Sequence, residues 1–367
     1  MKIHRKNIKY KYRRIGVGIT VFIAVLSLVL VNLPRAQASQ LNKKYSFIKT
    51  NYTVPTSNVA WVAPNGNDTS GNGSEGSPYA TFKKALSSIS NGGTVVAKSG
   101  IYREPHFFIS DDNVTIQAAP GAEVWLKGSD VVNSWTSENG IWKTTGNYHN
   151  FCHVCTTNAN PSVEGTAAYP EQVFINDEPL KQVKTKAEVT PGSNTFYVED
   201  NTPTTLKTPN NNADGYNIGQ QDAISYYIGK NPASGVTEIS ERARAFTSTG
   251  KNVSVKGINV AQYSPVQVWG FKDPYDPAAE RGVYSGPTAV SINGSGSLVQ
   301  DMIVTQSASQ GLFFNKAESS TARGVKAIDN GGSGVGANKS HNTVFTNGEL
   351  YGNNAEGFLT IGCGDEV

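Results

Sequence analysis

Cysteine, net charge and long hydrophobic runs are all scarce in this sequence. Three cysteines among 367 residues leave no second pair to complete a zinc site around the closely spaced Cys152 and Cys155. The chain holds 32 basic and 29 acidic residues, and its first 38 residues contain 8 of the basic ones and none of the acidic ones. The remainder has 24 basic and 29 acidic residues, a net charge of −5, so we expect no nucleic-acid partner.

The N-terminus contains the one long apolar run and is predicted to direct export. A basic start between Lys2 and Arg14 precedes the apolar stretch from Ile15 to Leu33. Ala36-Gln37-Ala38 then fits a signal-peptidase site. Residues 1–38 are therefore predicted to be a signal peptide, with an uncleaved membrane anchor as the alternative because the apolar stretch is long. We expect a secreted or cell-surface protein that meets a membrane only through this segment.

Export also bears on the cysteines. A local disulfide between Cys152 and Cys155 is the simpler interpretation in an exported chain. A metal site that used both with His149 would crowd its ligands into a short span, so we predict no metal site. Cys363 then has no predicted disulfide partner in this sequence.

Three glycines, Gly311, Gly334 and Gly357, lie 23 residues apart, and the residues around them keep the same step. A fixed period in this range indicates a solenoid, in which one structural unit stacks on the next. The unit is too short and too poor in helix formers for a pair of helices. Its Gly, Asn, Ser, Val and Thr content favours short strands joined by turns.

Stacked positions of the repeat indicate which way each side chain points. The column Leu312, Val335 and Phe358 is apolar and is expected to face inward. Two further columns, one through Val304 and one through Leu298, indicate a second and a third strand in each turn. Three short strands per turn of about 23 residues describe an all-β solenoid, the parallel β-helix. A corner at which Asn330 and Asn353 stack is also expected, since Asn tolerates left-handed dihedral angles.

The remaining segments are assigned from local signals. Pro78 to Ile89 is predicted to be a helix with Ser77 as its N-cap, which would cover the first coil. Asn176-Asp177 is predicted to turn a hairpin. The last apolar strand has too little chain after it for a polar cap, so we expect a C-terminally truncated fragment of a longer protein. The expected domains are a linker (39–59), an N-terminal cap with the first coils (60–150), a small β-rich insertion (151–250) and further coils (251–367).

The opening of the predicted mature chain resembles a known family. Trp61 to Asp68, Ser77 to Leu86, Gly92 to Ala97 and Gly100 to Glu104 are similar to the start of many right-handed parallel β-helix proteins of the pectin lyase-like superfamily. The resemblance implies a right-handed β-helix. It also implies a relation to secreted polysaccharide lyases and glycoside hydrolases, although this opening is a cap and first coil and not an active site.

Candidate substrate-binding residues lie on the expected outer face of the repeat. Phe313 could stack on a sugar ring, and Asn315 and Asn338 could bind hydroxyl groups, or these positions could serve only turns and packing. Lys316 and Lys339 are expected to stack one above the other, which would favour a uronate carboxylate between them unless both side chains extend into water. Arg323 completes the predicted substrate-binding set.

Asp329, Glu356 and Lys339 are the predicted catalytic residues, although each acid alone could also be a solvated or turn-capping group. Lyases of this superfamily need a base and often a calcium ion held by carboxylates, whereas hydrolases need two carboxyl groups. We predict an exported, monomeric carbohydrate-active protein that binds and cleaves a polysaccharide as a lyase or glycoside hydrolase, with calcium only in the lyase case. The alternative is a non-catalytic cell-surface carbohydrate-binding or adhesion module.

Overall fold

The structure is a computed structural model that describes residues 40–149, 151, 170–200, 209–210, 217–218, 224–265 and 288–361. The predicted signal peptide, Cys152, Cys155, Cys363 and the predicted loop from Val268 to Pro287 lie outside these residues. No helix in the described ranges is long and apolar enough to cross a membrane.

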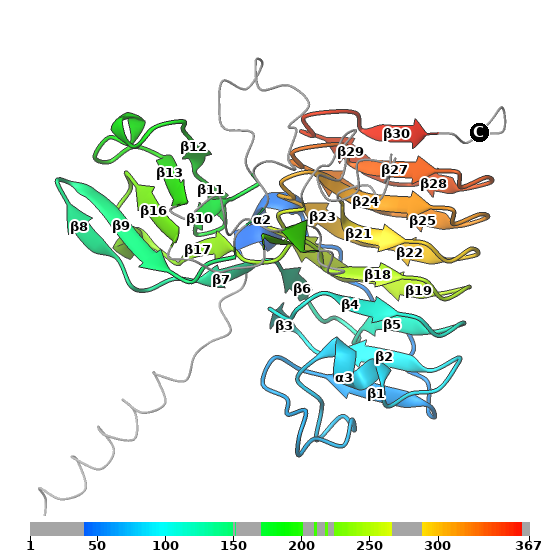
Figure 1. Cartoon of the computed structure of the whole chain (residues 1–367). Helices are drawn as coiled ribbons and strands as arrows, with labels where there is room; N and C mark the ends of the chain where they lie inside the picture. The colour runs from blue at the N-terminus through cyan, green and yellow to red at the C-terminus, as the bar shows by residue number, and fades with distance from the viewer. Residues whose placement is uncertain are drawn as a thin grey trace, which may run out of the picture. The chain divides into compact units, whose positions relative to one another are not determined.

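Three parallel sheets wind along the described chain and form a β-helix (Figure 1). Sheet 1 contains β1 (Val59–Val62), β2 (Thr94–Ala97), β5 (Thr115–Ala118), β19 (Ser254–Lys256), β22 (Leu298–Gln300), β25 (Thr321–Arg323) and β28 (Val344–Thr346). Sheet 2 contains β3 (Gly100–Tyr102), β6 (Val124–Lys127), β20 (Ile258–Ala261), β23 (Ile303–Thr305), β26 (Lys326–Ile328) and β29 (Glu349–Tyr351). Sheet 3 contains β4 (Phe107–Ile109), β18 (Phe246–Ser248), β21 (Thr288–Ile292), β24 (Gln310–Asn315), β27 (Val335–Asn338) and β30 (Phe358–Ile361).

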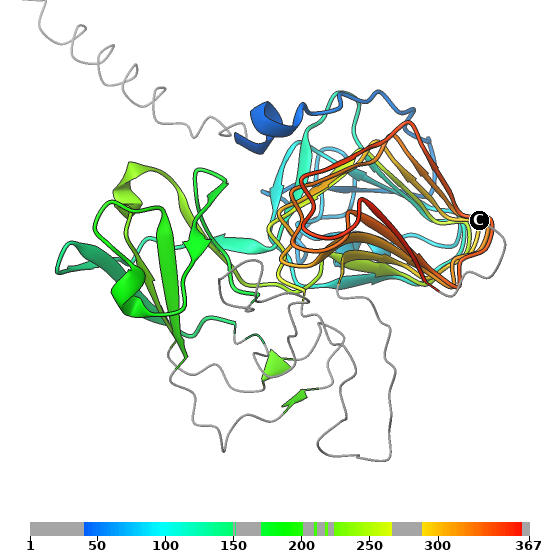
Figure 2. The same cartoon turned by 90° about the horizontal axis from the view of Figure 1, so that it is seen from above.

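The strand register confirms the repeat that the sequence predicted. Leu312 pairs with Val335, which pairs with Phe358, in adjacent parallel strands of sheet 3. The columns through Leu298 and Val304 fall on strands of sheets 1 and 2 in the same way. The coils therefore superpose when seen end on (Figure 2), and the fold is the predicted right-handed parallel β-helix.

The Asn330 corner is also confirmed. The side-chain oxygen of Asn353 accepts the backbone N–H of Asn330 at 3.1 Å and its side-chain amide at 2.9 Å. The Asn330 amide also donates to the carbonyl of Val304 at 3.2 Å. These bonds satisfy buried backbone groups where the chain turns between sheets 2 and 3, a position that we call the 2–3 corner.

The predicted helix from Pro78 to Ile89 is shorter than expected. Helix α3 (Phe82–Leu86) begins after Thr81, whose side chain accepts the N–H of Lys84, so Thr81 and not Ser77 is the N-cap. The residues before it cannot join the helix because Tyr79 donates its N–H to the Trp61 carbonyl in a strand-like bridge. Phe82 is buried and stacks on Phe107 with ring centroids 5.5 Å apart. A capping role for this short helix stays a prediction.

The segment predicted to be a linker (39–59) begins, in its described part, with a helix that contacts the β-helix. Helix α2 (Gln40–Tyr45) packs Leu41 and Tyr45 against sheet 2, and both side chains are buried. The facing side chains are apolar although they point out of the β-helix core. They are Trp125, Ala261, Ile303 and Ile328. Covering this outer apolar surface explains why the segment stays on the β-helix.

The β-rich insertion starts earlier than residue 151. It leaves the 2–3 corner of the second coil at β7 (Ser129–Val131) and returns with β17 (Thr237–Ser240), and these two strands pair antiparallel, which brings the ends of the insertion together. Its two sheets share an apolar core. The other strands are β8 (Thr136–Glu138), β9 (Ile141–Gly146), β10 (Val173–Ile175), β11 (Glu178–Pro179), β12 (Lys181–Gln182), β13 (Thr195–Asp200) and β16 (Ile224–Ile228), with a separate pair β14 (Pro209–Asn210) and β15 (Asn217–Ile218). Positive φ angles at Asn176 and Asp177 confirm the predicted hairpin turn.

A buried ionic cluster joins the insertion to the β-helix. The Lys127 ammonium, at the end of β6, lies 2.6 Å from a carboxylate oxygen of Asp177 and 2.6 Å from one of Glu238. Arg103 pairs with the same Glu238 carboxylate. Two cations and two anions thus balance in a region where the Lys127 and Glu238 side chains are each only 2% exposed. Such a cluster fixes the orientation of the insertion because each charge requires its partners.

Glu104 is expected to make the stability depend on pH. Its carboxylate, in the first coil, is 6% exposed and accepts the N–H groups of Phe82 and Lys83. Burial outweighs these bonds and raises the pKa of Glu104 from 4.5 to about 7. The native state therefore binds a proton that the unfolded chain has released, and stability present below pH 4.5 is lost as the pH rises through about 7. We expect the free energy of unfolding to fall by up to about 3 kcal/mol over this interval.

Urea unfolding across this pH range checks the expectation. Glu104→Gln should flatten the pH dependence, although not fully, since burial raises the pKa of Glu241 to about 7 as well. Glu75→Gln, at an exposed position, is the matched control and should leave the profile unchanged. Equal slopes in the wild type and Glu104→Gln would contradict the assignment.

Candidate functional site

The 2–3 corner is where the coils meet the insertion. The turns between β23 and β24, between β26 and β27 and between β29 and β30 stack on one another at this corner. The insertion leaves the β-helix at the same corner, two coils before the turn between β23 and β24. Turns of three successive coils therefore face a wall that is built by a separate part of the chain.

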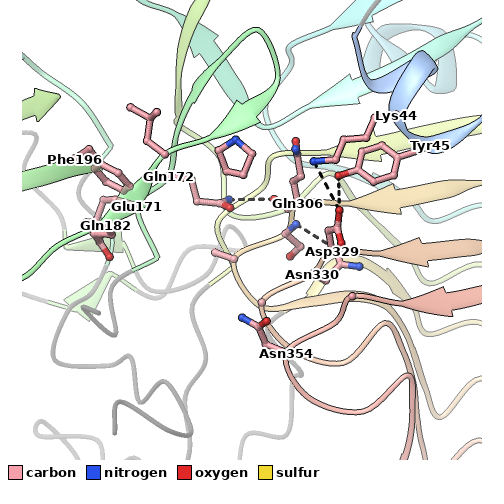
Figure 3. Close-up of a pocket in the computed structure, with 16 residues that line it drawn as sticks. Lys44, Tyr45, Glu171, Gln172, Gln182, Phe196, Gln306, Asp329, Asn330 and Asn354 are labelled. Atoms are coloured by element: carbon pink, nitrogen blue, oxygen red, sulfur yellow. Dashed lines mark hydrogen bonds and ion pairs between the residues drawn. The ribbon is translucent and has the colours of Figure 1, made fainter. Parts of the chain in front are cut away.

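A pocket of about 330 Å³ lies between the stacked turns of the β-helix, which form one wall, and the insertion, which forms the other. Figure 3 shows Glu171, Gln182 and Phe196 on the side of the insertion, with Asp329 and the neighbouring corner residues on the side of the β-helix. Helix α2 supplies a third side. The lining residues are Lys44, Tyr45, Glu171, Gln172, Pro179, Leu180, Gln182, Phe196, Gln306, Ser307, Ala308, Asp329, Asn330, Gly331, Gly352 and Asn354.

Asp329 is the acid that the β-helix presents to the pocket. It follows β26 with a φ of 55°, a left-handed conformation that Asp tolerates better than most residues. Its Oδ2 accepts the Tyr45 hydroxyl at 2.9 Å and lies 3.9 Å from the Lys44 ammonium. Gly352 stacks on it in the next coil, where a Cβ atom would lie 2.2 Å from Asp329 Oδ1. Only glycine leaves room for this carboxylate orientation, and Gly352 has itself a φ of +68°.

Tyr45 keeps its proton in this arrangement. Burial raises the pKa of its phenol well above the usual value, and the hydrogen bond to Asp329 raises that pKa further. The hydroxyl therefore donates to the carboxylate over the whole physiological pH range. Lys44 also reaches Glu178 of the insertion at 3.2 Å, so one ammonium group joins the two walls.

The insertion wall contributes a second acid, Glu171, which is only 3% exposed. Its neighbour Gln172 holds this wall on the coils, because its side-chain amide donates to the carbonyls of Tyr263 at 3.0 Å and Gln306 at 3.1 Å. Gln306 in turn donates to the carbonyl of Asp177 at 2.7 Å. Two carboxylates, one from each wall, thus line a single pocket.

The predicted catalytic residues do not all come together. Asp329 lines the pocket, and Glu356 lies at the same corner, where its carboxylate accepts the Ser333 hydroxyl at 2.9 Å. Lys339 follows β27 at the other end of sheet 3, and Lys316 stacks beside it in the preceding coil. Both lysines are exposed, but they are separated from Asp329 and Glu356 by the length of a strand.

Two of the predicted substrate-binding residues, Phe313 and Asn338, are buried and in contact with neighbouring coils. Phe313 is only 1% exposed, and its ring occupies the space over Gly336 in the next coil, so it cannot stack on a sugar as predicted. Asn338 donates to the side-chain oxygen of Asn315 at 2.9 Å, a ladder that uses both side chains for stacking. Arg323 is exposed at the end of β25 in sheet 1, away from the pocket.

Calcium, which the resemblance implies only if the protein is a lyase, stays a prediction. Nowhere in the described ranges do three or more His, Cys, Asp or Glu side chains come close enough to hold a metal ion.

The structure is similar to solved structures of other proteins. XylC in a complex with xylose aligns with a TM-score of 0.61 at 16% identity, over 81% of this chain and 54% of that chain. This chain and XylC share the parallel β-helix fold. The chain spans about half the length of XylC, and this level of identity establishes the β-helix and not the reaction.

Two further similarities are more distant. A glycoside hydrolase aligns with a TM-score of 0.49 at 13% identity, over 76% of this chain and 67% of that chain. Pectate lyase Pel9A aligns with a TM-score of 0.41 at 13% identity, over 81% of this chain and 48% of that chain. No protein-family model and no curated protein matches the sequence.

Proposed function

We propose that this β-helix protein is an exported glycoside hydrolase that takes the end of a neutral saccharide into the pocket at the 2–3 corner. The observation that carries the proposal is the pair of carboxylates, Asp329 from the β-helix and Glu171 from the insertion, that lines one pocket. Glycoside hydrolysis commonly needs two such groups, one to protonate the leaving oxygen and one to act on the other side of the sugar. Amide and hydroxyl side chains around them supply partners for sugar hydroxyls.

The charge of the pocket favours a neutral sugar over a uronate. Among the lining residues that the structure describes, Lys44 is the one cation, against the two acids Glu171 and Asp329. Its ammonium already lies near Glu178 and Asp329. A uronate carboxylate would add a third negative charge without a new cation to balance it. A lyase, which must stabilise charge at that carboxylate, would need more positive charge than these residues provide.

The size and walls of the pocket favour a chain end over a long open groove. A volume of about 330 Å³ is at the lower end of the range for small-molecule sites. Walls from α2, the insertion and the stacked turns surround it on several sides. The xylose in the XylC complex is a neutral sugar of this kind, which supports the choice of substrates for a first test.

Cleavage assays with the purified protein test the proposal. We expect sugar release from aryl glycosides and oligosaccharides of neutral sugars, without the ultraviolet absorbance of new double bonds. Unsaturated products from uronate-containing polysaccharides would establish a lyase instead. Saccharide binding without any product would favour the binding module, and the absence of both binding and product would overturn the proposal.

A further inference from the structure

Helix α2 reaches the pocket from a distant part of the sequence. Lys44 and Tyr45 are 284 or more residues from Asp329, yet both approach its Oδ2 atom. Tyr45 is 3% exposed, so its ring is fixed by packing before its hydroxyl meets the carboxylate. The other oxygen, Oδ1, occupies the space that a Cβ atom at Gly352 would fill. One oxygen of Asp329 is therefore held by α2, and the other is packed against Gly352 of the next coil.

The segment that carries α2 is also attached to sheet 1 and to the turns between sheets 1 and 2. We call residues 40–53 the strap. Its carbonyl groups at Thr50 and Thr53 accept the N–H of Gly121 at 2.8 Å and the side-chain amide of Gln117 at 3.0 Å. At its far end the Tyr52 hydroxyl donates to Asp301 Oδ2 at 2.5 Å. The strap therefore makes two tyrosine–aspartate bonds, of which only the one at Tyr45 lies at the pocket.

We propose that Tyr45 and Lys44 are positioning residues of the active site: Tyr45 fixes the orientation of the Asp329 carboxylate at the pocket, and Lys44 sets the spacing of the two pocket walls. The inference rests on the proposed function. Lys44 can act in this way because its ammonium lies between Glu178 on β11 and Asp329 after β26. Tyr45 can do so because a hydrogen bond to a charged group fixes both distance and direction.

Two matched tyrosine variants test the role of Tyr45. Tyr45→Phe removes the hydroxyl and should lower kcat by about 10- to 100-fold with KM changed less than about threefold, as expected for the loss of one hydrogen bond to a charged group. Tyr52→Phe removes the equivalent bond to Asp301, outside the pocket, and should leave both constants unchanged. Equal effects of the two variants on kcat would overturn the inference.

Two variants, one that removes the positive charge of Lys44 and one that keeps it, test the bridging role of this residue. Lys44→Met should lower kcat/KM, and Lys44→Arg, which keeps the charge, should restore a large part of it. Failure of the arginine variant to exceed the methionine variant would count against a bridging role.

Hydrogen exchange separates this inference from the proposed function. Tyr45→Phe and Lys44→Met should speed amide exchange in residues 327–331 and 178–182, whereas Tyr52→Phe should not. If the wild type cleaves no glycoside but these segments loosen as expected, the function fails and the positioning role stands. If the wild type is active and neither exchange nor kcat responds, the positioning role fails and the function stands. Unchanged exchange in an inactive protein overturns both.

Discussion

Asp329→Asn is expected to lower the rate of glycoside cleavage by about 10³-fold or more, with the protein still folded. Asparagine tolerates the left-handed backbone at this position and offers an oxygen to the Tyr45 hydroxyl, so the fold should persist. What is lost is the negative charge and basicity of the carboxylate, which no other group on the β-helix wall of the pocket supplies among the described lining residues. Steady-state kinetics on a neutral aryl glycoside measure the effect.

Asp301→Asn is a closely matched control. Asp301 also has a positive φ, also accepts a strap tyrosine and is also stacked under a glycine of the next coil, Gly324. It lies between β22 and β23, outside the pocket. We expect the control to keep its activity within about twofold. If Asp329→Asn lost less than about tenfold, or if both variants lost the same, Asp329 would not be the catalytic carboxylate.

Glu171→Gln tests the partner on the other wall. A pair of carboxylates that acts as a unit gives non-additive losses. We therefore expect the double variant of Glu171 and Asp329 to be about as slow as the slower single variant. Additive losses would indicate that the two acids work independently, and full activity of Glu171→Gln would leave Glu356, at the same corner, as the candidate to test next.

The repeat could be predicted because parallel stacking puts residue i directly on residue i+23. Leu312 over Val335, and Val260 over Val304 across a longer gap, are visible as columns in the sequence. The strap could not be predicted in this way, since the buried residues of sheet 2 that Leu41 and Tyr45 meet are 80 or more positions away. The sequence did contain one indication of the strap. Ile303 and Ile328 are next to inward-facing residues, so β23 and β26 carry apolar side chains on both faces. The apolar side chains on the outer face need to be covered by another part of the chain.

The site was only partly visible in the sequence. Asp329 could be selected because it is an acid at a repeat corner, but its partner Glu171 comes from the insertion, where the period is lost. The burial of Phe313 and the bond from Asn338 to Asn315 could not be predicted, because a period of two gives the face of a strand and not what covers that face. Lys127 ends an otherwise apolar strand, and its two partners are 50 and 111 residues away, so only the folded chain brings them together.

Lys127→Met is expected to lower the free energy of unfolding by about 3–5 kcal/mol, the largest stability effect among the described residues that we discuss. Methionine fills the volume but removes the ammonium group that the buried carboxylates of Asp177 and Glu238 share. Removing one member of a buried ion pair costs more than the pair itself contributes, because the remaining charge stays desolvated. Chemical denaturation followed by tryptophan fluorescence measures the loss.

Two further variants make this prediction specific. Lys326→Met removes a lysine of the same sheet whose partner, Glu349 at 3.0 Å, is half exposed, and it should cost less than about 1 kcal/mol. Lys127→Met combined with Asp177→Asn removes one charge of each sign and leaves Arg103 paired with Glu238. This double variant should recover at least about 1 kcal/mol over Lys127→Met alone, because the unpaired buried charge is gone. A double variant no more stable than the single one would mean that Lys127 acts through packing and not through its charge.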